Sequence, residues 1–390
     1  MTLISDSSSL KDMCTTLAKE SFVCIDTEFM REGTYWPRLC LIQLADPKGN
    51  AFAVDPLISD INLVPLFDLM NNEKVPKVIH AARQDIEIFF YLTGTTPRPI
   101  FDTQVAAMVC GFGEAASYET LARKLASTRI DKSFRFSDWS NRPLQTRQLE
   151  YALADVTHLP KIYDALQKQL IRTGRGSWVS DEMSALCKTE IYDLDPMDAW
   201  RKVKTRNAGP RTLAILREIT AVRESWARQQ DVPRQRIIRD VSLLEVASSR
   251  PKTHAQLARI RGFSEGAARG KLGSDLLKGV ARGIDVKNEE CPNPPARTTT
   301  ATGSGSVVDL LKVLLKACSE KHGVAQKLVA TASDLVEIAA GVNTVPALAG
   351  WRYGIFGCDA LKLKNGNLAL SVKDGTVSIT ESHISKPNTV

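Results

Sequence analysis

The first 170 residues alternate short apolar runs with helical segments, and this alternation limits the possible folds more than any other feature of the chain. Three runs near residues 21–25, 38–45 and 51–54 are joined by short turns, which predicts an antiparallel meander. Two further runs, at 77–80 and 99–101, are separated by segments with helical spacing. Because strands that alternate with helices form parallel sheets covered on both faces, the sequence predicts a mixed α/β domain.

The rest of the chain has helical spacing. Residues 146–170 have the pattern of one long helix, in which Pro160 predicts a kink or a break. Two later helical stretches, which resemble diverged copies of one design, are separated by a Pro/Thr/Gly/Ser-rich linker. We therefore expect an α/β domain at 1–175, a connecting segment at 176–206, small all-α domains at 207–286 and 305–385, and a linker at 287–304.

The charge of the chain is unevenly distributed. The net charge is +7, but residues 201–282 alone hold nineteen Lys and Arg against seven Asp and Glu, a local balance of +12. The remainder therefore carries −5. A basic helical part that follows an acidic N-terminal part indicates that the chain binds a large anion, and nucleic acid is the expected one. A solvated helical surface that is merely rich in arginine is the alternative.

Several classes of protein are excluded. There is no apolar stretch of 18 residues, so we expect no transmembrane helix, and the N-terminus lacks the features of a secretory signal. The eight cysteines are scattered, which predicts neither a disulfide framework nor a zinc site. No Gly-x₄-Gly-Lys-Ser/Thr loop occurs, so we expect no nucleotide cofactor. A cytoplasmic protein that does not bind membranes is the resulting expectation.

Two carboxylates one residue apart close the first apolar run. On a strand, Asp26 and Glu28 point to the same side, and Thr27 points away. Carboxylates held together repel each other unless a cation lies between them, and Mg²⁺ prefers oxygen ligands. An Asp-x-Glu pair occurs roughly once by chance in a chain of this length, so the pair alone is weak evidence.

Two further elements could complete such a site. Asp85 follows the strand at 77–80, where a helix begins, although an acidic residue there is also explained by the helix dipole. Tyr151 and Asp155 lie four residues apart and thus on one face of a helix. Taken alone, that pair could be a solvent-facing pair without a role.

In this order, the elements resemble the DEDDy branch of the 3′→5′ exonucleases, and the ribonuclease D family most closely. The motifs that carry the resemblance are Asp26-Thr-Glu-Phe29, Tyr35-Trp-Pro-Arg-Leu-Cys-Leu-Ile-Gln-Leu44, Val78-Ile-His-Ala-Ala-Arg-Gln-Asp85, Phe101-Asp-Thr-Gln104 and Tyr151-Ala-Leu-Ala-Asp155. The helical domains resemble HRDC domains, the first through Ile238-x-Asp240 and Leu257-x-x-Ile260-x-Gly262, and the second more weakly. The resemblance covers nearly the whole chain and implies a ribonuclease H-like sheet.

The resemblance implies a site and a reaction. Asp26, Glu28, Asp85 and Asp155 would hold two divalent ions, Mg²⁺ or Mn²⁺, and Tyr151 would orient the attacking water. A phenol has an ordinary pKa of about 10, which makes it a poor base at neutral pH. The enzyme would remove 3′-terminal nucleotides from RNA, including transfer RNA precursors, and release 5′-mononucleotides.

Substrate contacts are expected from two regions. Thr27, Phe29 and Met30 would contact the terminal nucleotides, although Phe29 or Met30 could instead belong to the core. Phosphate contacts are expected from arginines of the helical part as a group. The candidates are Arg211, Arg217, Arg234, Arg236, Arg239, Arg259 and Arg261.

The sequence leaves two alternative functions open. A DNA exonuclease of the same superfamily would have the same motifs. An inactive nucleic-acid-binding scaffold is a third possibility, which the intact set of acidic residues argues against.

Overall fold

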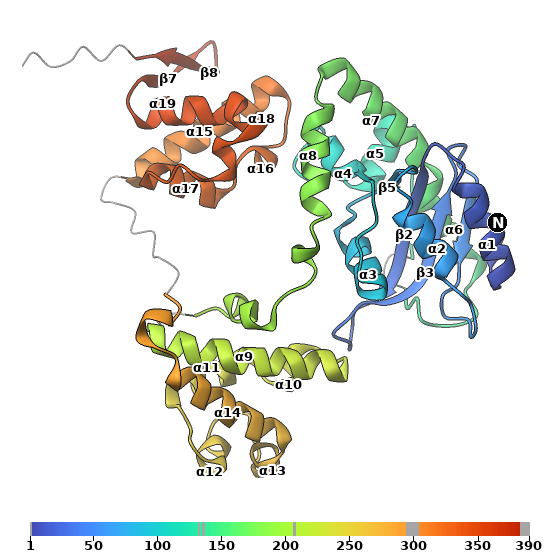
Figure 1. Cartoon of the computed structure of the whole chain (residues 1–390). Coiled ribbons are helices and arrows are strands. Elements are labelled where there is room, and N and C mark those ends of the chain that lie inside the picture. Colours follow the sequence, from blue (N-terminus) through green and yellow to red (C-terminus); the bar gives the residue numbers. More distant parts are fainter. Residues whose placement is uncertain (1, 132, 135–136, 206–207, 294–303, 383–390) are drawn as a thin grey trace, which may run out of the picture.

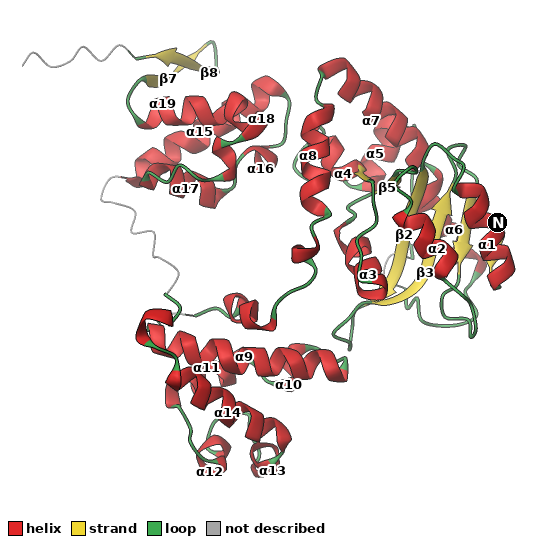
Figure 2. Ribbon diagram, in the orientation of Figure 1, coloured by secondary structure: helices red, strands yellow, loops and turns green. Residues whose placement is uncertain are grey.

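The chain forms three units (Figure 1). The computed structural model describes residues 2–131, 133–134, 137–205, 208–293 and 304–382. An α/β domain comes first, followed by a helical unit at 210–285 and a further unit at 304–382 (Figure 2). Residues 294–303 of the predicted linker lie outside the described part. No helix in that described part is both long and apolar enough to cross a bilayer.

A mixed six-stranded sheet is the centre of the α/β domain. Its strand order is β1-β4-β3-β2-β5-β6. Strands β2, β3 and β4 pair antiparallel, and β5 and β6 continue the sheet in parallel, which confirms the predicted meander and the predicted parallel portion. The bounds are β1 Thr2–Ile4, β2 Val23–Met30, β3 Arg38–Ala45, β4 Ala51–Val54, β5 Lys77–Ile79 and β6 Ile100–Asp102.

Helices cover both faces of this sheet. Helix α6 packs across β2, β3 and β4, above a small cluster of buried residues that includes Cys40 and Trp139. The opposite face carries the larger core, to which α1, α2, α3 and α7 contribute. The bounds are α1 Ser7–Leu17, α2 Val64–Asn71, α3 Arg83–Thr93, α4 Thr103–Val109, α5 Tyr118–Leu125, α6 Thr146–Thr157, α7 Leu159–Thr173 and α8 Gly176–Leu186.

The predicted break in the long helical segment is present. Helix α6 ends at Thr157 and α7 begins at Leu159, with Pro160 in its first turn. Pro160 has no backbone N–H and fits a first turn, where that N–H would have no partner in the helix. The break lets α6 cover the face of the sheet that holds the carboxylates, while α7 packs elsewhere.

The predicted connecting segment at 176–206 is packed rather than free. Helix α8 buries Val179 and Met183 in the larger core, and Tyr192 belongs to the same core. The short helix η2 (Pro196–Lys202) then packs against α9 of the next unit. The α/β domain therefore extends past residue 175, to about residue 192.

The unit at 210–285 is helical, as expected. It consists of α9 Pro210–Gln230, α10 Arg234–Ile237, α11 Asp240–Ser249, α12 His254–Ala258, α13 Glu265–Arg269 and α14 Lys271–Asp285. Leu213, Leu216 and Ile219 on one side of α9 are fully buried. Helix α14 approaches α9 so closely that a Cβ atom on Gly283 would lie 2.4 Å from Cα of Ile215. Only glycine fits this crossing.

The unit at 304–382 has its own core. Its helices are α15 Ser304–His322, α16 Gln326–Val329, α17 Ala332–Ala340, α18 Gly350–Arg352 and α19 Cys358–Lys364. An antiparallel hairpin, β7 (Leu368–Lys373) with β8 (Thr376–Glu381), follows α19. The expectation of an all-α domain did not include this hairpin.

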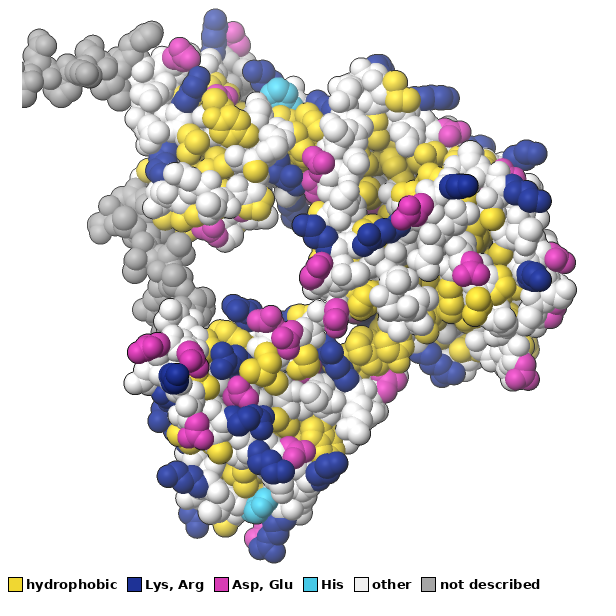
Figure 3. All heavy atoms as spheres, viewed as in Figure 1, with side chains coloured by type: hydrophobic (Ala, Val, Ile, Leu, Met, Phe, Trp, Pro, Cys, Tyr) yellow, Lys and Arg dark blue, Asp and Glu magenta, His cyan; other side chains and the backbone are white. Residues whose placement is uncertain are grey.

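Both later units contact the α/β domain, at separate places. Trp178 of α8 stacks on Trp351 with ring centroids 4.5 Å apart, and the backbone N–H of Ala325 donates to the carbonyl of Met108 at 3.0 Å. The unit at 210–285 is held through Asp231, which accepts the backbone N–H groups of Tyr35 and Trp36, both at 3.0 Å. Figure 3 shows an opening between the three units.

Candidate active site

Strand β2 carries the first two predicted carboxylates. Asp26 pairs with Gln43 of β3, and Glu28 pairs with Leu41, so the two acids lie within the strand rather than at its end. Because side chains alternate along a strand, both carboxylates point to the face that α6 covers. The register shifts between Glu28 and Phe29, which marks a bulge directly after the acidic pair.

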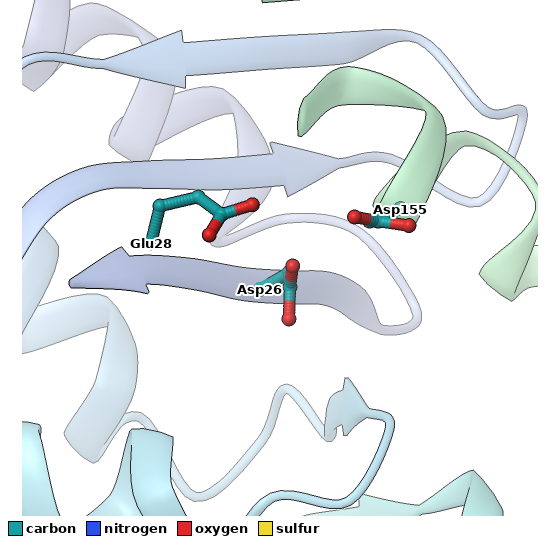
Figure 4. Close-up of side chains that lie close together, drawn as sticks. All are labelled: Asp26, Glu28 and Asp155. Carbon is teal, nitrogen blue, oxygen red and sulfur yellow. The ribbon is translucent and has the colours of Figure 1, made fainter. Parts of the chain in front are cut away.

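Helix α6 brings Asp155 to the same place. Carboxylate oxygens of Asp26, Glu28 and Asp155 all lie within 4.8 Å of one another. Figure 4 shows the three side chains facing one space, two from the strand and one from the helix. Tyr151 lies one turn before Asp155, and its ring centroid is 6.1 Å from that of Trp139. The structure thus brings together three of the four predicted acids, with the predicted tyrosine on the same helix.

The electrostatics of this cluster favour a bound cation. Burial, followed by the charges of neighbouring carboxylates, holds the pKa of Asp26 well above its usual range. The same causes raise the pKa of Glu28 to about 9, and burial raises the pKa of Asp155 to about 7. Ionising three neighbouring carboxyl groups is costly unless a cation lies among them. Because the groups release their protons when a cation binds, the cluster fits a hard divalent ion with oxygen ligands.

Asp85 lies beside this cluster and is held by a different partner. The hydroxyl of Thr27 donates to Oδ1 of Asp85 at 2.5 Å, and both residues are 5% exposed. Burial raises the pKa of Asp85 to about 7, and the bond from Thr27 opposes that shift. Thr27 does point away from the other two acids, as predicted. The side chain of Thr27 is thus engaged with Asp85, and the expected contact of Thr27 with substrate stays a prediction.

A buried aspartate fixes the turn that presents Asp85. Asp102 accepts the backbone N–H groups of Ala81 at 3.0 Å and Ala82 at 2.9 Å, and it also caps α4 through Gln104 at 2.8 Å. Ala81 has a positive φ of 58°, which is uncommon for a residue with a side chain. Asp102 therefore ties the turn before α3 to the turn after β6. Asp102 lies in the motif Phe101-Asp-Thr-Gln104, and its place before a helical segment is the sequence signal for this capping role.

His80 precedes that turn and is neutral. Its Nδ1 lies 3.0 Å from Oγ1 of Thr103, which itself donates to the carbonyl of Ile79 at 3.2 Å. Since the hydroxyl proton of Thr103 is used there, Nδ1 of His80 carries the proton of their shared bond. Burial lowers the pKa of His80 to about 4.

The predicted substrate contacts divide into two groups. Phe29 packs partly against the larger core and Met30 partly against the cluster under α6, so both have the structural role considered as an alternative. Arg211 donates to the carbonyls of Gly283 at 3.2 Å and Ile284 at 2.7 Å, at the end of α14.

Arg234 is also engaged within the fold, because it pairs with the buried Glu224 at 3.0 Å. Arg211 and Arg234 therefore have partners within the fold, and their contact with substrate stays a prediction. Arg236 and Arg239 are exposed.

The chain is similar to known proteins in both its α/β domain and its first helical unit. A 3′-5′ exonuclease family model matches residues 1–171, and an HRDC domain model matches residues 212–280. The ribonuclease D of Jannaschia sp. (strain CCS1) is 45% identical over 381 residues, which cover 97% of this chain and 99% of that protein. The ribonuclease D of Granulibacter bethesdensis is 47% identical over 373 residues, covering 95% and 94% of the two chains.

A solved structure is similar to this chain over nearly its full length. The crystal structure of Escherichia coli RNase D, described as an exoribonuclease involved in structured RNA processing, has a TM-score of 0.80 to this chain at 27% identity. The match covers 93% of this chain and 98% of that one. The HRDC match falls within the unit predicted at 207–286, whereas an HRDC-like assignment of residues 305–385 stays a prediction. With its exonuclease domain, its clustered carboxylates and its near full-length relatives, the chain belongs to the ribonuclease D family of 3′→5′ exoribonucleases.

Proposed function

We propose that this chain shortens RNA from the 3′ end by hydrolysis at the carboxylate cluster and releases 5′-mononucleotides. The observation that carries the proposal is the convergence of Asp26, Glu28 and Asp155, from elements far apart in the sequence, within 4.8 Å of one another. Transfer RNA precursors are the substrates we propose, because processing of structured RNA is described for the Escherichia coli relative.

The carboxylates would hold two divalent ions, Mg²⁺ or Mn²⁺. Asp26, Glu28 and Asp155 would hold one ion, and Asp26 with Asp85 would hold the other. Such ions supply stabilisation of the phosphoryl oxygens and activation of water. The raised pKa values imply that the carboxyl groups give up protons as ions bind, so ion binding should strengthen as the pH rises.

The side chains around the cluster orient the substrate and the water. Tyr151 lies on the same face of α6 as Asp155, one helical turn away, so its hydroxyl can direct a water toward the terminal phosphodiester. The ring of Trp139 lies 6.1 Å from the ring of Tyr151 and is buried, which limits the motion of the phenol. Thr27 holds Asp85 at the edge of the cluster.

RNA is the proposed substrate, and DNA is the competing one. The carboxylates themselves do not distinguish the two, since neither the metals nor the water contact the 2′-hydroxyl in this scheme. The names of the full-length relatives favour RNA. An inactive scaffold is disfavoured because all four acids and the tyrosine are present.

The test compares matched RNA and DNA strands that carry a label at the 5′ end or the 3′ end, in Mg²⁺. We expect 3′-labelled RNA to release labelled mononucleotide at once, and 5′-labelled RNA to shorten stepwise. Asp155→Asn should lose activity by about three orders of magnitude or more. Glu150→Gln is the matched control, because Glu150 is an exposed acid on the same helix. Faster cleavage of DNA than of RNA, or full activity in Asp155→Asn, would overturn the proposal.

A further inference from the structure

One buried side chain beside the carboxylate cluster has no hydrogen-bonding partner. Gln43 of β3 is fully buried. Neither its Oε1 nor its Nε2 forms a hydrogen bond with any residue that the structure describes. An amide that has left water without gaining a partner destabilises a fold, and few buried amides are left in this state. An apolar side chain of the same size would fill the space without that cost, so the amide needs a functional explanation.

Gln43 lies directly opposite Asp26 in the sheet. Side chains of opposite residues in an antiparallel pair lie on the same face, with Cβ atoms about 4.5–5.5 Å apart. On the other side of Gln43, the opposite residue is Ala53 of β4, which has no polar side chain. Leu41 and Ala45 precede and follow Gln43 on the same face of β3. The carboxylate of Asp26 is thus the polar group that the sheet places beside the Gln43 amide.

Helix α6 covers Gln43 from above. It packs across β3 and β4 as well as β2. Its residue Ala152 belongs to the same small buried cluster as Leu41 and Ala53, the two apolar neighbours of Gln43. One turn later the same helix carries Asp155, which faces the same space as Asp26 (Figure 4). Gln43 therefore lies beneath the helix that brings Asp155 to the site, next to the acid that both proposed ions would share.

The site already contains one donor that holds a carboxylate from behind. The hydroxyl of Thr27 donates to Oδ1 of Asp85, the acid proposed to share the second ion with Asp26. Asp55, which follows β4, is used elsewhere, because its two oxygens accept from Arg142 at 2.6 and 2.7 Å. The amide of Gln43 is placed to do for Asp26 what the Thr27 hydroxyl does for Asp85.

We propose that Gln43 is a positioning residue of the metal site, whose amide N–H donates to the ionised carboxylate of Asp26 and holds it in the orientation that reaches both ions. The proposal rests on the proposed function, since it takes Asp26 to bind metal. A carboxylate shared by two cations must be held in one rotation, and a donor beside it both fixes that rotation and favours the charged form.

The test compares Gln43→Met with Leu41→Met in the full chain. Methionine is unbranched and close to glutamine in size, so Gln43→Met removes the amide and changes the packing little. Leu41→Met is the matched control, because Leu41 is fully buried on the same face of β3 and lies opposite Glu28. Melting temperature is measured in EDTA and at one fixed Mn²⁺ concentration, and calorimetric titration gives the affinity for Mn²⁺.

We expect Gln43→Met to have opposite effects without and with the metal. In EDTA the variant should melt at the same temperature as the unaltered chain or higher, because it no longer buries an unpaired amide. Its affinity for Mn²⁺ should fall about tenfold or more, so Mn²⁺ should raise its melting temperature less than that of the unaltered chain. A purely structural role of Gln43 would instead lower the melting temperature equally in both conditions and leave the affinity unchanged.

Hydrolysis of RNA in Mg²⁺ gives a second readout. In Gln43→Met, kcat should fall about tenfold or more while KM for RNA changes little, because Asp26 would bind ions rather than the RNA chain. Unchanged Mn²⁺ affinity in Gln43→Met, or an equal loss of affinity in Leu41→Met, would overturn the proposal. Failure of the proposed function itself would appear differently, as an unaltered chain that binds no Mn²⁺ or does not hydrolyse RNA.

Discussion

The hydroxyl of Thr27 and the carboxylate of Asp85 are joined by a buried hydrogen bond of 2.5 Å. The bond connects β2, which carries Asp26 and Glu28, to the first turn of α3. Thr27 and Asp85 are 58 residues apart, so the bond fixes one part of the site against another. A hydroxyl that donates to a carboxylate also favours its ionised form, which is the form that binds a cation.

Replacement of Thr27 should therefore weaken metal binding. Thr27→Val keeps the shape of the side chain but removes the donor, and loss of such an outer partner costs about 10–100-fold in metal affinity or activity. Thr27→Ser keeps the donor and loses only a methyl group. Calorimetric titration with Mn²⁺ checks the prediction. The prediction is contradicted if Thr27→Val binds Mn²⁺ as tightly as the unaltered chain, or if Thr27→Ser loses as much affinity as Thr27→Val.

The raised pKa values predict that the metal-free chain becomes less stable as the pH rises. Asp and Glu have ordinary pKa values of 3.8 and 4.5, whereas burial raises those of Asp85 and Asp155 to about 7 and that of Glu28 to about 9. Between these limits these three carboxyl groups hold more protons in the folded chain than in the unfolded one, so their contribution to the free energy of unfolding falls with rising pH. The stabilisation is complete below pH 4 and is lost as the pH passes from about 4 to about 9. The lowered pKa of His80 acts in the opposite direction between about pH 4 and its ordinary value, but it is one group against three.

Scanning calorimetry in EDTA measures this effect, as the melting temperature of the α/β domain between pH 5 and pH 9. Glu28→Gln should flatten the decline because it removes one of the shifted groups, whereas Glu150→Gln, an exposed acid, should leave it unchanged. Added Mn²⁺ should raise the melting temperature more at pH 8 than at pH 6, because fewer protons compete with the ion. A melting temperature that rises from pH 5 to pH 9 in EDTA would refute the predicted direction of the pH dependence.

Asp231 holds the first helical unit against the α/β domain. One oxygen of Asp231 accepts two backbone N–H groups of the loop after β2, and the residue has a positive φ of 48°. Asp231→Ala removes the charged acceptor, worth about 1.5–3 kcal/mol for a hydrogen bond, and forces alanine into a left-handed conformation. Asp231→Asn keeps an oxygen acceptor and a side chain that tolerates this conformation.

We therefore expect Asp231→Ala to loosen this contact and Asp231→Asn to preserve most of it. Limited proteolysis of the segment at 188–209 should be about tenfold faster in Asp231→Ala, which corresponds to a docking contact weakened by about 1.4 kcal/mol or more. Small-angle scattering should show a larger radius of gyration for the same variant. Identical proteolysis of the two variants would argue against the role of Asp231.

Gly283 lies where α14 crosses α9, so we expect a substitution there to lower the stability of this unit. A Cβ atom there would lie 2.4 Å from Cα of Ile215, so Gly283→Ala should force the helices apart and destabilise this unit by about 1–3 kcal/mol. Gly266→Ala is the control, because Gly266 lies in α13 with no atom within 4 Å of the added group. Alanine there should be neutral or slightly stabilising. Urea unfolding followed by circular dichroism measures both.

The parts of the fold that could be predicted from the sequence are those with a local cause. The meander, the parallel strands and the break before Pro160 follow from periodicity and from the backbone of proline, and the structure confirms them. Strand β1 was missed because it has three residues and depends on its pairing with β4. The hairpin β7–β8 was missed although the sequence offered a signal for it, since apolar residues alternate in both strands around the turn at Asp374 and Gly375.

The site was predictable to a similar extent. The strand period placed Asp26 and Glu28 together, and the helical period placed Tyr151 with Asp155, but no local rule shows that α6 crosses the sheet above β2. Arg211 and Arg236 look alike in sequence, although one caps α14 and the other is exposed. The carbonyl groups that bind Arg211 are brought to it only by folding, so the sequence does not reveal them.

The most direct test of the central claim is the anomalous scattering of Mn²⁺ in crystals of the full chain soaked with a nucleoside 5′-monophosphate. We expect two peaks about 4 Å apart, one among Asp26, Glu28 and Asp155 and the other between Asp26 and Asp85. An absence of peaks at these four carboxylates, with the chain folded and Mn²⁺ in excess, would contradict it.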